Sequence, residues 1–387
     1  MLLTETLCAG GAELFVVRLA NALAGAGHDV LIAVVNGEMV HPAVAGKVHS
    51  AVVIERLVMP AKRAVQRADR LLRALRIDLP VVHMLQRRSL GAIVRRWMPD
   101  VVHSHLVKAD WLAADLKARS KAFRHVITHH GEQIAYANRT ADPQMLHYDK
   151  RMRRITDQAD GIALISDQQE QHFRGAYGNS HAGVTRILNG YEMPEGSTAP
   201  TRAMLRLPEG KLIFGMVSRG IPDKGWGEAI AAFQRLGRED IALVLVGEGP
   251  FFARLGKPPP GIIVPGFSAN PFEWIRHFNV GLLPTYYVGE SLPTVIVEYL
   301  ICGKPVIASD IGEIPKMICA PSGEFAGVLV PHFDRERLVD ELAEAMLLLA
   351  DDPALRRRKG ALAIEAAQKF DMATCVAQYT KLYQREN

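Results

Sequence analysis

Residues 280–308 read VGLLPTYYVGESLPTVIVEYLICGKPVIA. The apolar runs Val280–Leu283 and Pro305–Ala308 predict two buried strands, and the stretch Pro293–Cys302 between them predicts a helix. A strand, a helix and a second strand in succession are typical of a parallel sheet that is covered by helices. This stretch therefore indicates an α/β fold.

The same alternation extends along the rest of the chain. In the second half, strands are expected at Leu212–Val217, Ala242–Val246 and Ile262–Val264, with a helix at Trp226–Leu236. In the first half, strands are expected at Met1–Thr4, Val30–Val35, Asp100–His103, His125–Thr128 and Gly161–Ile165, with a helix at Ala12–Ala26. The pattern predicts two doubly wound, Rossmann-like α/β domains that face each other across a cleft, with the ligand outside the carboxyl ends of the strands.

The length of the chain, 387 residues, also favours two domains. Single hydrophobic cores stop growing near about 250–300 residues. The stretch Glu192–Pro200 is rich in Pro, Gly, Ser and Thr and is interpreted as the interdomain linker. The predicted boundaries are 1–190 for the first domain, 191–200 for the linker and 201–368 for the second domain.

The four cysteines, Cys8, Cys302, Cys319 and Cys375, include no Cys-x-x-Cys pair. Their spacing favours reduced thiols in a cytosolic protein over a disulfide framework or a zinc site. The N-terminus lacks a basic region followed by an apolar run, so no signal peptide is expected. No stretch approaches the roughly 20 apolar residues of a membrane span, so any membrane contact is expected to be peripheral.

The chain is mildly basic, with a net charge of +5, and much of the excess lies in residues 61–97. The basic residues there are Lys62, Arg63, Arg67, Arg70, Arg73, Arg76, Arg87, Arg88, Arg95 and Arg96, opposed only by Asp69 and Asp78. Helices with leucines on one side and arginines on the other are expected, and such helices dock onto anionic membrane surfaces. A solvated charged face explains the pattern equally well. Nucleic acid is disfavoured because the segment has almost no aromatic residues to stack on bases.

Residues 280–308 contain two glutamates that are candidate ligand-binding residues. Glu290 lies in the loop before the expected helix, and Glu298 lies about one turn into it. The start of that helix, formed by Ser291, Leu292, Pro293 and Thr294, suits an anionic diphosphate, and a carboxylate on the helix suits two ribose hydroxyls. Taken alone, two glutamates at this spacing are more often surface residues, whereas the whole string is far more specific.

The string from Glu290 to Ser309 resembles the E-x7-E signature of family 4 of the retaining glycosyltransferases, and the similarity covers essentially the entire chain. The resemblance implies the two-domain glycosyltransferase B fold, with Glu290 near the transferred sugar and Glu298 on the donor ribose. The tail Phe370–Tyr383 resembles the family's final helix, so residues 369–387 are expected to cross back to the first domain. The residues after Ser309 depart from the family's double glycine.

The resemblance also implies further donor-binding residues. Arg219 and Lys224 fit a basic pair that holds the donor diphosphate, and cations are needed where charge develops on a leaving nucleotide. Two solvated charges on a loop are the alternative. Gly10 and Gly11 fit a glycine pair that lets the backbone approach the donor's phosphate. Their turn is not G-x-G-x-x-G, so an NAD site is disfavoured.

Histidines end two of the expected strands. The resemblance implies that His105 and His130 are the family's two histidines, with His130 beside the reacting sugar and His129 as an alternative in register. Taken alone, these histidines are more often structural. A His-x-His pair also occurs in metal sites, but the sequence shows neither a third ligand nor an H-E-x-x-H motif. Neither a metal nor a cofactor is expected.

The predicted function is a retaining transfer of a sugar from a nucleotide sugar, UDP-linked by preference and GDP-linked as the alternative. Its catalytic residues would be His130, Glu290, Arg219 and Lys224. The expected acceptor is a glycan or a lipid-linked molecule of cell-surface polysaccharide or lipopolysaccharide biosynthesis. The expected location is the cytoplasm, with a peripheral position on the inner face of the cell membrane as the alternative. The alternatives are a nucleotide-sugar epimerase of the same fold and a non-catalytic nucleotide-sugar-binding scaffold.

Overall fold

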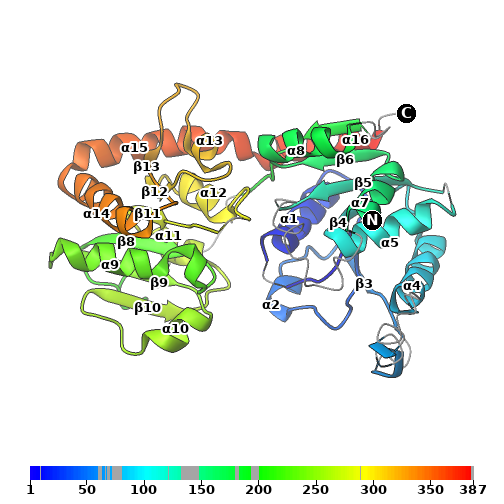
Figure 1. The fold of residues 1–387 in the computed structure, drawn as a ribbon, viewed down its shortest axis with the longest axis horizontal. Helices are drawn as coiled ribbons and strands as arrows, with labels where there is room; N and C mark the ends of the chain where they lie inside the picture. Colours follow the sequence, from blue (N-terminus) through cyan, green and yellow to red (C-terminus); the bar gives the residue numbers. More distant parts are fainter. Residues whose placement is uncertain are drawn as a thin grey trace. The chain divides into compact units, whose positions relative to one another are not determined.

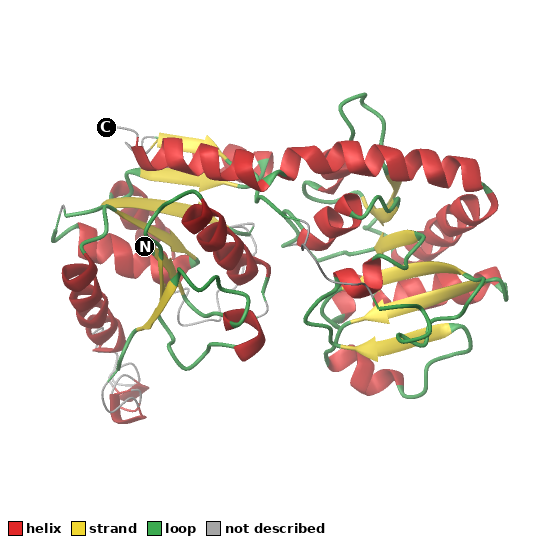
Figure 2. Cartoon of the chain, turned by 180° about the vertical axis from the view of Figure 1, so that it is seen from behind, coloured by secondary structure: helices red, strands yellow, loops and turns green. Residues whose placement is uncertain are grey.

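The computed structural model describes residues 1–8, 10–59, 63–65, 67, 70–71, 81–120, 122–131, 148–178, 183–192, 200–287 and 289–384. The chain divides into two compact units. Unit 1 comprises Met1–Gly190 with Met372–Asn387, and unit 2 comprises Tyr191–Asp371. In each unit a parallel sheet is flanked by helices (Figures 1 and 2), so the predicted pair of Rossmann-like domains is confirmed. Residues 193–199 of the predicted linker lie outside the described residues.

The described part of unit 1 holds a sheet of seven strands in the order β3-β2-β1-β4-β5-β6-β7. The strands are β1 (Leu2–Thr4), β2 (Leu31–Val34), β3 (Val53–Arg56), β4 (Val101–His105), β5 (Arg124–His129), β6 (Gly161–Leu164) and β7 (Gly183–Arg186). The helices are α1 (Gly11–Gly25), α2 (Pro42–Ala45), α4 (Val81–Trp97), α5 (Val107–Lys117), α7 (Tyr148–Asp157), α8 (Asp167–Tyr177) and α16 (Met372–Gln384). The sequence does not predict the edge strands β3 and β7, because VIER and GVTR lack a continuous apolar run.

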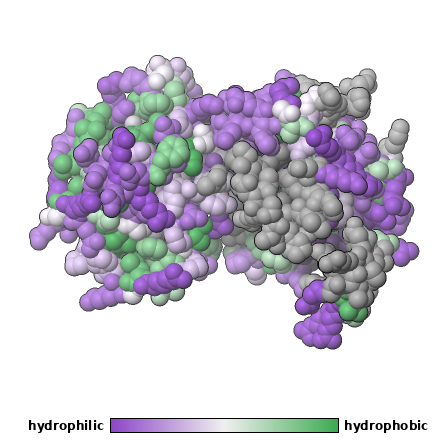
Figure 3. Space-filling view, in the orientation of Figure 1, coloured by the Kyte–Doolittle hydropathy of each residue, from purple (hydrophilic) through white to green (hydrophobic). Residues whose placement is uncertain are grey.

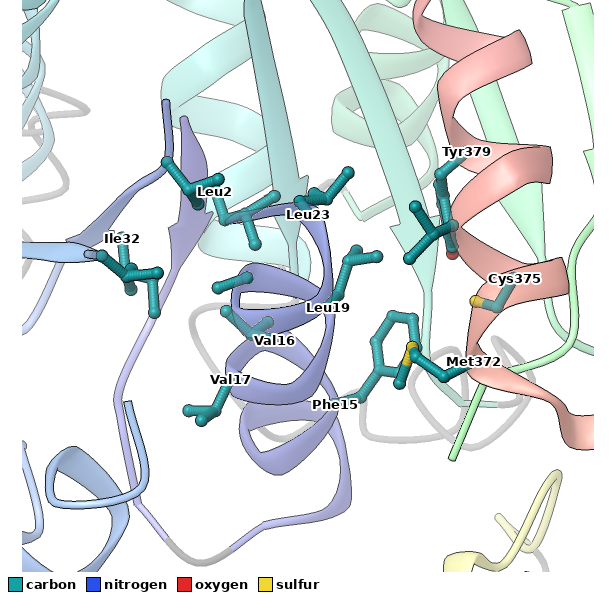
Figure 4. Close-up of a cluster of buried hydrophobic side chains, with 14 of the residues drawn as sticks. Leu2, Phe15, Val16, Val17, Leu19, Leu23, Ile32, Met372, Cys375 and Tyr379 are labelled. Carbon is teal, nitrogen blue, oxygen red and sulfur yellow. The ribbon is translucent and has the colours of Figure 1, made fainter. Parts of the chain in front are cut away.

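Helix α16 belongs to unit 1 although it lies at the far end of the sequence. Figure 4 shows α1 and α16 side by side, with Phe15 and Leu19 of α1 directed toward Met372 and Tyr379 of α16. All four side chains belong to one buried cluster. Burial of each large apolar side chain contributes about 1.5–3 kcal/mol, so α16 completes the core of this unit.

Unit 2 holds, in its described part, a sheet of six strands in the order β10-β9-β8-β11-β12-β13. The strands are β8 (Leu212–Val217), β9 (Ile241–Val246), β10 (Ile262–Gly266), β11 (Val280–Leu283), β12 (Val306–Ser309) and β13 (Gly327–Val330). The α-helices are α9 (Trp226–Leu236), α10 (Pro250–Leu255), α11 (Phe272–Ile275), α12 (Thr294–Ile301), α13 (Ile314–Ile318), α14 (Arg335–Asp351) and α15 (Pro353–Ala367). Two 3-10 helices, η2 (Pro222–Lys224) and η3 (Gln368–Phe370), complete the unit.

The helix after the glutamate loop starts one residue later than predicted. Pro293 has an extended backbone, with φ −65° and ψ 115°, and α12 begins at Thr294. Proline therefore occupies the N-cap of this helix and not its first turn.

In unit 2, the edge strand β13 is not predicted from the sequence, as β3 and β7 are not in unit 1.

The surface of unit 2 that Figure 3 displays mixes polar and apolar residues. Among the described residues of both units, none of the helices combines the length and the apolar character needed to cross a bilayer.

Candidate functional site

A buried ion pair lies at the centre of the candidate site in unit 2. The Lys224 ammonium, at the end of η2, bonds to Oε2 of Glu290, in the loop before α12. The side chains are 11% and 8% exposed, so water screens the pair poorly. The Thr285 hydroxyl donates a second hydrogen bond, of 3.1 Å, to the same oxygen. The structure thus brings together two of the predicted catalytic residues.

The backbone around the pair explains why these side chains meet. Gly225 has a left-handed φ of +82°, and a Cβ atom there would lie 2.0 Å from the Pro284 carbonyl oxygen. Only glycine allows so close an approach. The loop is also held by the Tyr286 N–H, which donates to the Asp223 carbonyl at 2.9 Å. Lys224 therefore extends from a segment that is fixed against the loop after β11.

A second glycine supports the backbone of Glu290. Gly312, after β12, has a φ of +58°, and a Cβ atom there would lie 2.3 Å from the Glu290 carbonyl oxygen. The Glu313 N–H donates to the Ser291 carbonyl at 3.1 Å. The sequence departs from the family's double glycine here. Gly312 is nevertheless present at the position where this loop lies closest to the Glu290 carbonyl.

Glu298 lies within α12 and is buried, with 6% of the residue exposed. Its Oε1 accepts a hydrogen bond from the hydroxyl of Tyr191, the first residue of unit 2. Ser291 and Leu292, which precede the helix, are buried as well. The sequence points to Glu298 but not to Tyr191, because 107 residues separate the two and no motif links them.

Arg219 follows β8 and has an exposed side chain, in contrast to Lys224. Its backbone is fixed by the Trp226 indole, whose Nε1 donates to the Arg219 carbonyl at 2.9 Å. The exposed guanidinium and the buried ammonium therefore extend from one short loop. An exposed cation beside a buried one suits a ligand whose charge changes during reaction.

In unit 1, His105 at the end of β4 and His130 after β5 form a hydrogen-bonded pair. Nδ1 of His105 lies 2.8 Å from Nε2 of His130, and the Phe15 ring meets both imidazoles edge-on. Burial lowers the pKa of His105 well below its usual value and lowers the pKa of His130 to about 3. Both rings are therefore neutral near pH 7. His129 lies elsewhere, beside Phe173, and burial lowers its pKa to about 4.

A network that the sequence does not reveal lies behind this pair. His103 Nδ1 lies 2.8 Å from the Tyr383 hydroxyl, and its Nε2 lies 2.7 Å from the Thr128 hydroxyl. Thr128 also contacts the Tyr379 hydroxyl at 2.8 Å. The two tyrosines belong to α16, so the C-terminal helix fixes the strands that carry the histidine pair. His103 and Tyr383 are 280 residues apart, and no local pattern connects them.

The predicted glycine pair lies at the start of α1. Gly10 is the N-cap, and Gly11 is the first helical residue and is exposed. The Glu13 carboxylate lies against Gly10, where a Cβ atom would be 2.2 Å from Oε2. The Thr6 hydroxyl donates to the other carboxylate oxygen at 2.7 Å. The first turn of α1 therefore holds an acidic side chain beside the two glycines.

The predicted basic segment is only partly described. Arg63, Arg67, Arg70, Arg88 and Arg95 are exposed, whereas Lys62, Arg73 and Arg76 lie outside the described residues. On α4, Arg87 lies 3.8 Å from Asp115, and Arg96 pairs with Glu55. Among the described residues of the chain, no group of three or more His, Cys, Asp and Glu side chains is arranged to hold a metal ion.

Two family models match the chain. The model described as Glycosyl transferases group 1 matches residues 198–365, and the model described as Glycosyltransferase Family 4 matches residues 9–193. A curated relative is the D-inositol 3-phosphate glycosyltransferase of Kribbella flavida, 26% identical over 307 residues that cover 70% of this chain and 68% of the relative. Across the first four curated relatives, the chain spans between 23% and 68% of the relative's own length.

Solved structures share the fold over nearly the whole chain. Sucrose-phosphate synthase from Thermosynechococcus elongatus superposes with a TM-score of 0.76 at 21% identity, covering 99% of this chain and 98% of that one. HepE of Anabaena, solved in complex with UDP, gives a TM-score of 0.68 at 18% identity and 98% coverage of both chains. At these identities the similarity establishes the fold alone.

Proposed function

Since the chain belongs to the glycosyltransferases of group 1 and family 4, we propose that it moves a sugar from a nucleotide-sugar donor to a glycan or lipid-linked acceptor. The observation that carries the proposal is the buried Lys224–Glu290 pair, which lies beside the start of α12 in unit 2. A cation held in a poorly hydrated place interacts strongly with phosphate. UDP is the preferred nucleotide, supported by the related fold of HepE in complex with UDP, and GDP is the alternative.

The donor would bind with its diphosphate near Lys224 and Arg219 and its ribose at Glu298. Thr294 begins α12, and the N–H groups of this first turn favour negative charge. Contact of Gly10 and Gly11 with a donor phosphate stays a prediction. Because Lys224 is already held by Glu290, its ammonium needs little reorganisation when charge develops on the leaving phosphate.

The transfer would proceed with retention of the anomeric configuration. The bond from the anomeric carbon to the phosphate oxygen breaks, and the bond to the acceptor oxygen forms on the same face of the sugar. The proton of the acceptor hydroxyl passes to the leaving phosphate. Glu290 would stabilise the oxocarbenium-like sugar, and no metal would take part.

The histidine pair would position the transferred sugar. Among the described residues, Nε2 of His105 and Nδ1 of His130 are buried and have no hydrogen-bond partner. One proton is shared across the pair, so of these two outer nitrogens one is an N–H donor and the other an acceptor. The sugar would contact the ring of His130, which is partly exposed, and not these buried nitrogens. His129 is turned toward Phe173 and would not take this part.

The acceptor would be reached at an anionic membrane surface, in polysaccharide or lipopolysaccharide synthesis at the inner face of the cell membrane. Met84, Arg88 and Arg95 lie on the exposed side of α4. Trp97 and Met98 at its end are 42% and 79% exposed. Cations mixed with exposed apolar side chains suit the headgroup region of a bilayer. Binding to phosphatidylglycerol vesicles tests this part of the proposal. The affinity should fall in the double variant Arg88→Glu, Arg95→Glu and stay unchanged in the control Arg358→Glu.

Acceptor-dependent release of the nucleotide tests the transferase activity itself. The protein is incubated with UDP-sugars and a pool of lipid-linked and free glycans, and the anomer of the product is assigned from its proton coupling constant. Release of UDP only with an acceptor, and an unchanged anomeric configuration, support the proposal. Interconversion of two nucleotide sugars without an acceptor indicates an epimerase, and nucleotide binding without any turnover indicates a scaffold.

A further inference from the structure

Tyr191 occupies an unusual place, because it is the first residue of unit 2 and it contacts a predicted donor-binding residue. Its hydroxyl donates a hydrogen bond to Oε1 of Glu298. The residue is 7% exposed, and Glu298 is 6% exposed. A hydrogen bond between two buried groups, one of them a carboxylate, is among the stronger polar contacts in a protein.

The tyrosine is held in position from several directions. Its N–H donates to the Phe370 carbonyl at 2.7 Å, and it forms an isolated parallel bridge with Asp371. Its ring meets Phe272 of α11 edge-on, with centroids 5.9 Å apart. Because backbone and ring are both fixed, the hydroxyl is presented to Glu298 at a defined point.

A carboxylate has about four lone-pair positions on its two oxygens. Glu298 can therefore accept the Tyr191 hydroxyl and ribose hydroxyls at the same time. Without the phenol, the carboxylate would lose one of the hydrogen bonds that fix its last side-chain torsion, which is otherwise broad and soft. The tyrosine thus restricts the carboxylate before a ribose binds, so that binding costs less conformational entropy.

We propose that Tyr191 is a positioning residue, which holds the Glu298 carboxylate in the orientation that accepts ribose hydroxyls and so sets the preference for ribonucleotides over deoxyribonucleotides. This inference rests on the proposed binding of a nucleotide-sugar donor at Glu298. Tyr191 acts through Glu298 and has no contact of its own with the reacting sugar in this scheme.

The test compares the dissociation constants of UDP and 2′-deoxy-UDP, measured by calorimetry on the full chain. Tyr191→Phe keeps the buried ring and removes only the hydroxyl. It is expected to weaken the binding of UDP roughly tenfold and that of 2′-deoxy-UDP much less, so that the ribose preference shrinks. A purely structural role would weaken both ligands alike.

Two further variants separate the outcomes. Because Tyr191 acts through Glu298, adding Tyr191→Phe to Glu298→Gln should change UDP affinity less than about twofold. Tyr177→Phe removes a hydroxyl from a buried tyrosine of α8 and should leave both constants unchanged.

If wild-type protein binds no uridine nucleotide, the proposed function itself fails. If wild type prefers UDP and Tyr191→Phe keeps the same affinity and the same preference, the positioning role of Tyr191 is overturned and the donor site stands.

Discussion

Replacing Glu290 by Gln should destabilise unit 2 far more than the loss of one surface charge. The substitution leaves the Lys224 ammonium buried beside a neutral amide. Removing one partner of a buried ion pair costs about 3–5 kcal/mol, because the remaining charge is neither hydrated nor compensated. In a unit of this size each kcal/mol lowers the melting temperature by about 2–4 °C, so we expect a decrease of roughly 6–20 °C.

Differential scanning calorimetry without nucleotide measures this effect. The matched control is Glu324→Gln, which breaks an ion pair with Arg358 in the same unit, where both side chains are largely exposed. That pair should contribute less than about 1 kcal/mol. A double variant, Lys224→Met with Glu290→Gln, removes both charges and should regain most of the stability that Glu290→Gln loses.

Melting of Glu290→Gln within a few degrees of the Glu324→Gln control would contradict a large contribution of the buried pair to stability. A double variant that loses as much stability as the two single variants added together would contradict it as well, since that result would show no coupling between the side chains.

Two more effects follow from backbone geometry and from buried histidines. Gly225→Ala should destabilise unit 2 strongly, because its Cβ would lie 2.0 Å from the Pro284 carbonyl oxygen; Gly237→Ala, also at positive φ but with no atom within 4 Å, should cost only about 1–2 kcal/mol in thermal unfolding. Equal melting temperatures would contradict this. Burial lowers the pKa values of His105 and His130, so the unfolded chain binds the extra protons. The free energy of unfolding should then fall, for each histidine, by up to about 1.4 kcal/mol per pH unit below about 6.5. Urea midpoints that stay constant from pH 7 to pH 5 would contradict it.

The sequence predicts most strands of both sheets, because many central strands are continuous apolar runs. Such runs are typical of parallel strands that are buried on both faces. Helix α9 has the predicted bounds, Trp226–Leu236, since glycines in the left-handed conformation stand at both of its ends. The edge strands β3 (VIER) and β7 (GVTR) lack a continuous apolar run. The edge strand β13 (GVLV) is a short apolar run, which periodicity alone does not distinguish from part of a buried helix.

The candidate site is predictable where a motif or the topology supplies it. Lys224 and Glu290 are 66 residues apart, yet they follow the neighbouring parallel strands β8 and β11, whose carboxyl ends meet at one edge. The contacts of Tyr191 with Glu298 and of Tyr383 with His103 follow no such rule, because they depend on where the chain enters unit 2 and where it returns to unit 1. Sequence periodicity carries no information about that placement.

The most direct test of the donor site is a thermal-shift panel of UDP, GDP and ADP, each also with common sugars attached, on wild type and on Glu298→Ala. A ligand at about a hundred times its dissociation constant should add roughly 2.7 kcal/mol of stability. One nucleotide, UDP by preference, is expected to stabilise wild type and to stabilise Glu298→Ala much less. No shift with any nucleotide, or an equal shift in both proteins, would contradict the assignment of the donor site to Lys224, Glu290 and Glu298.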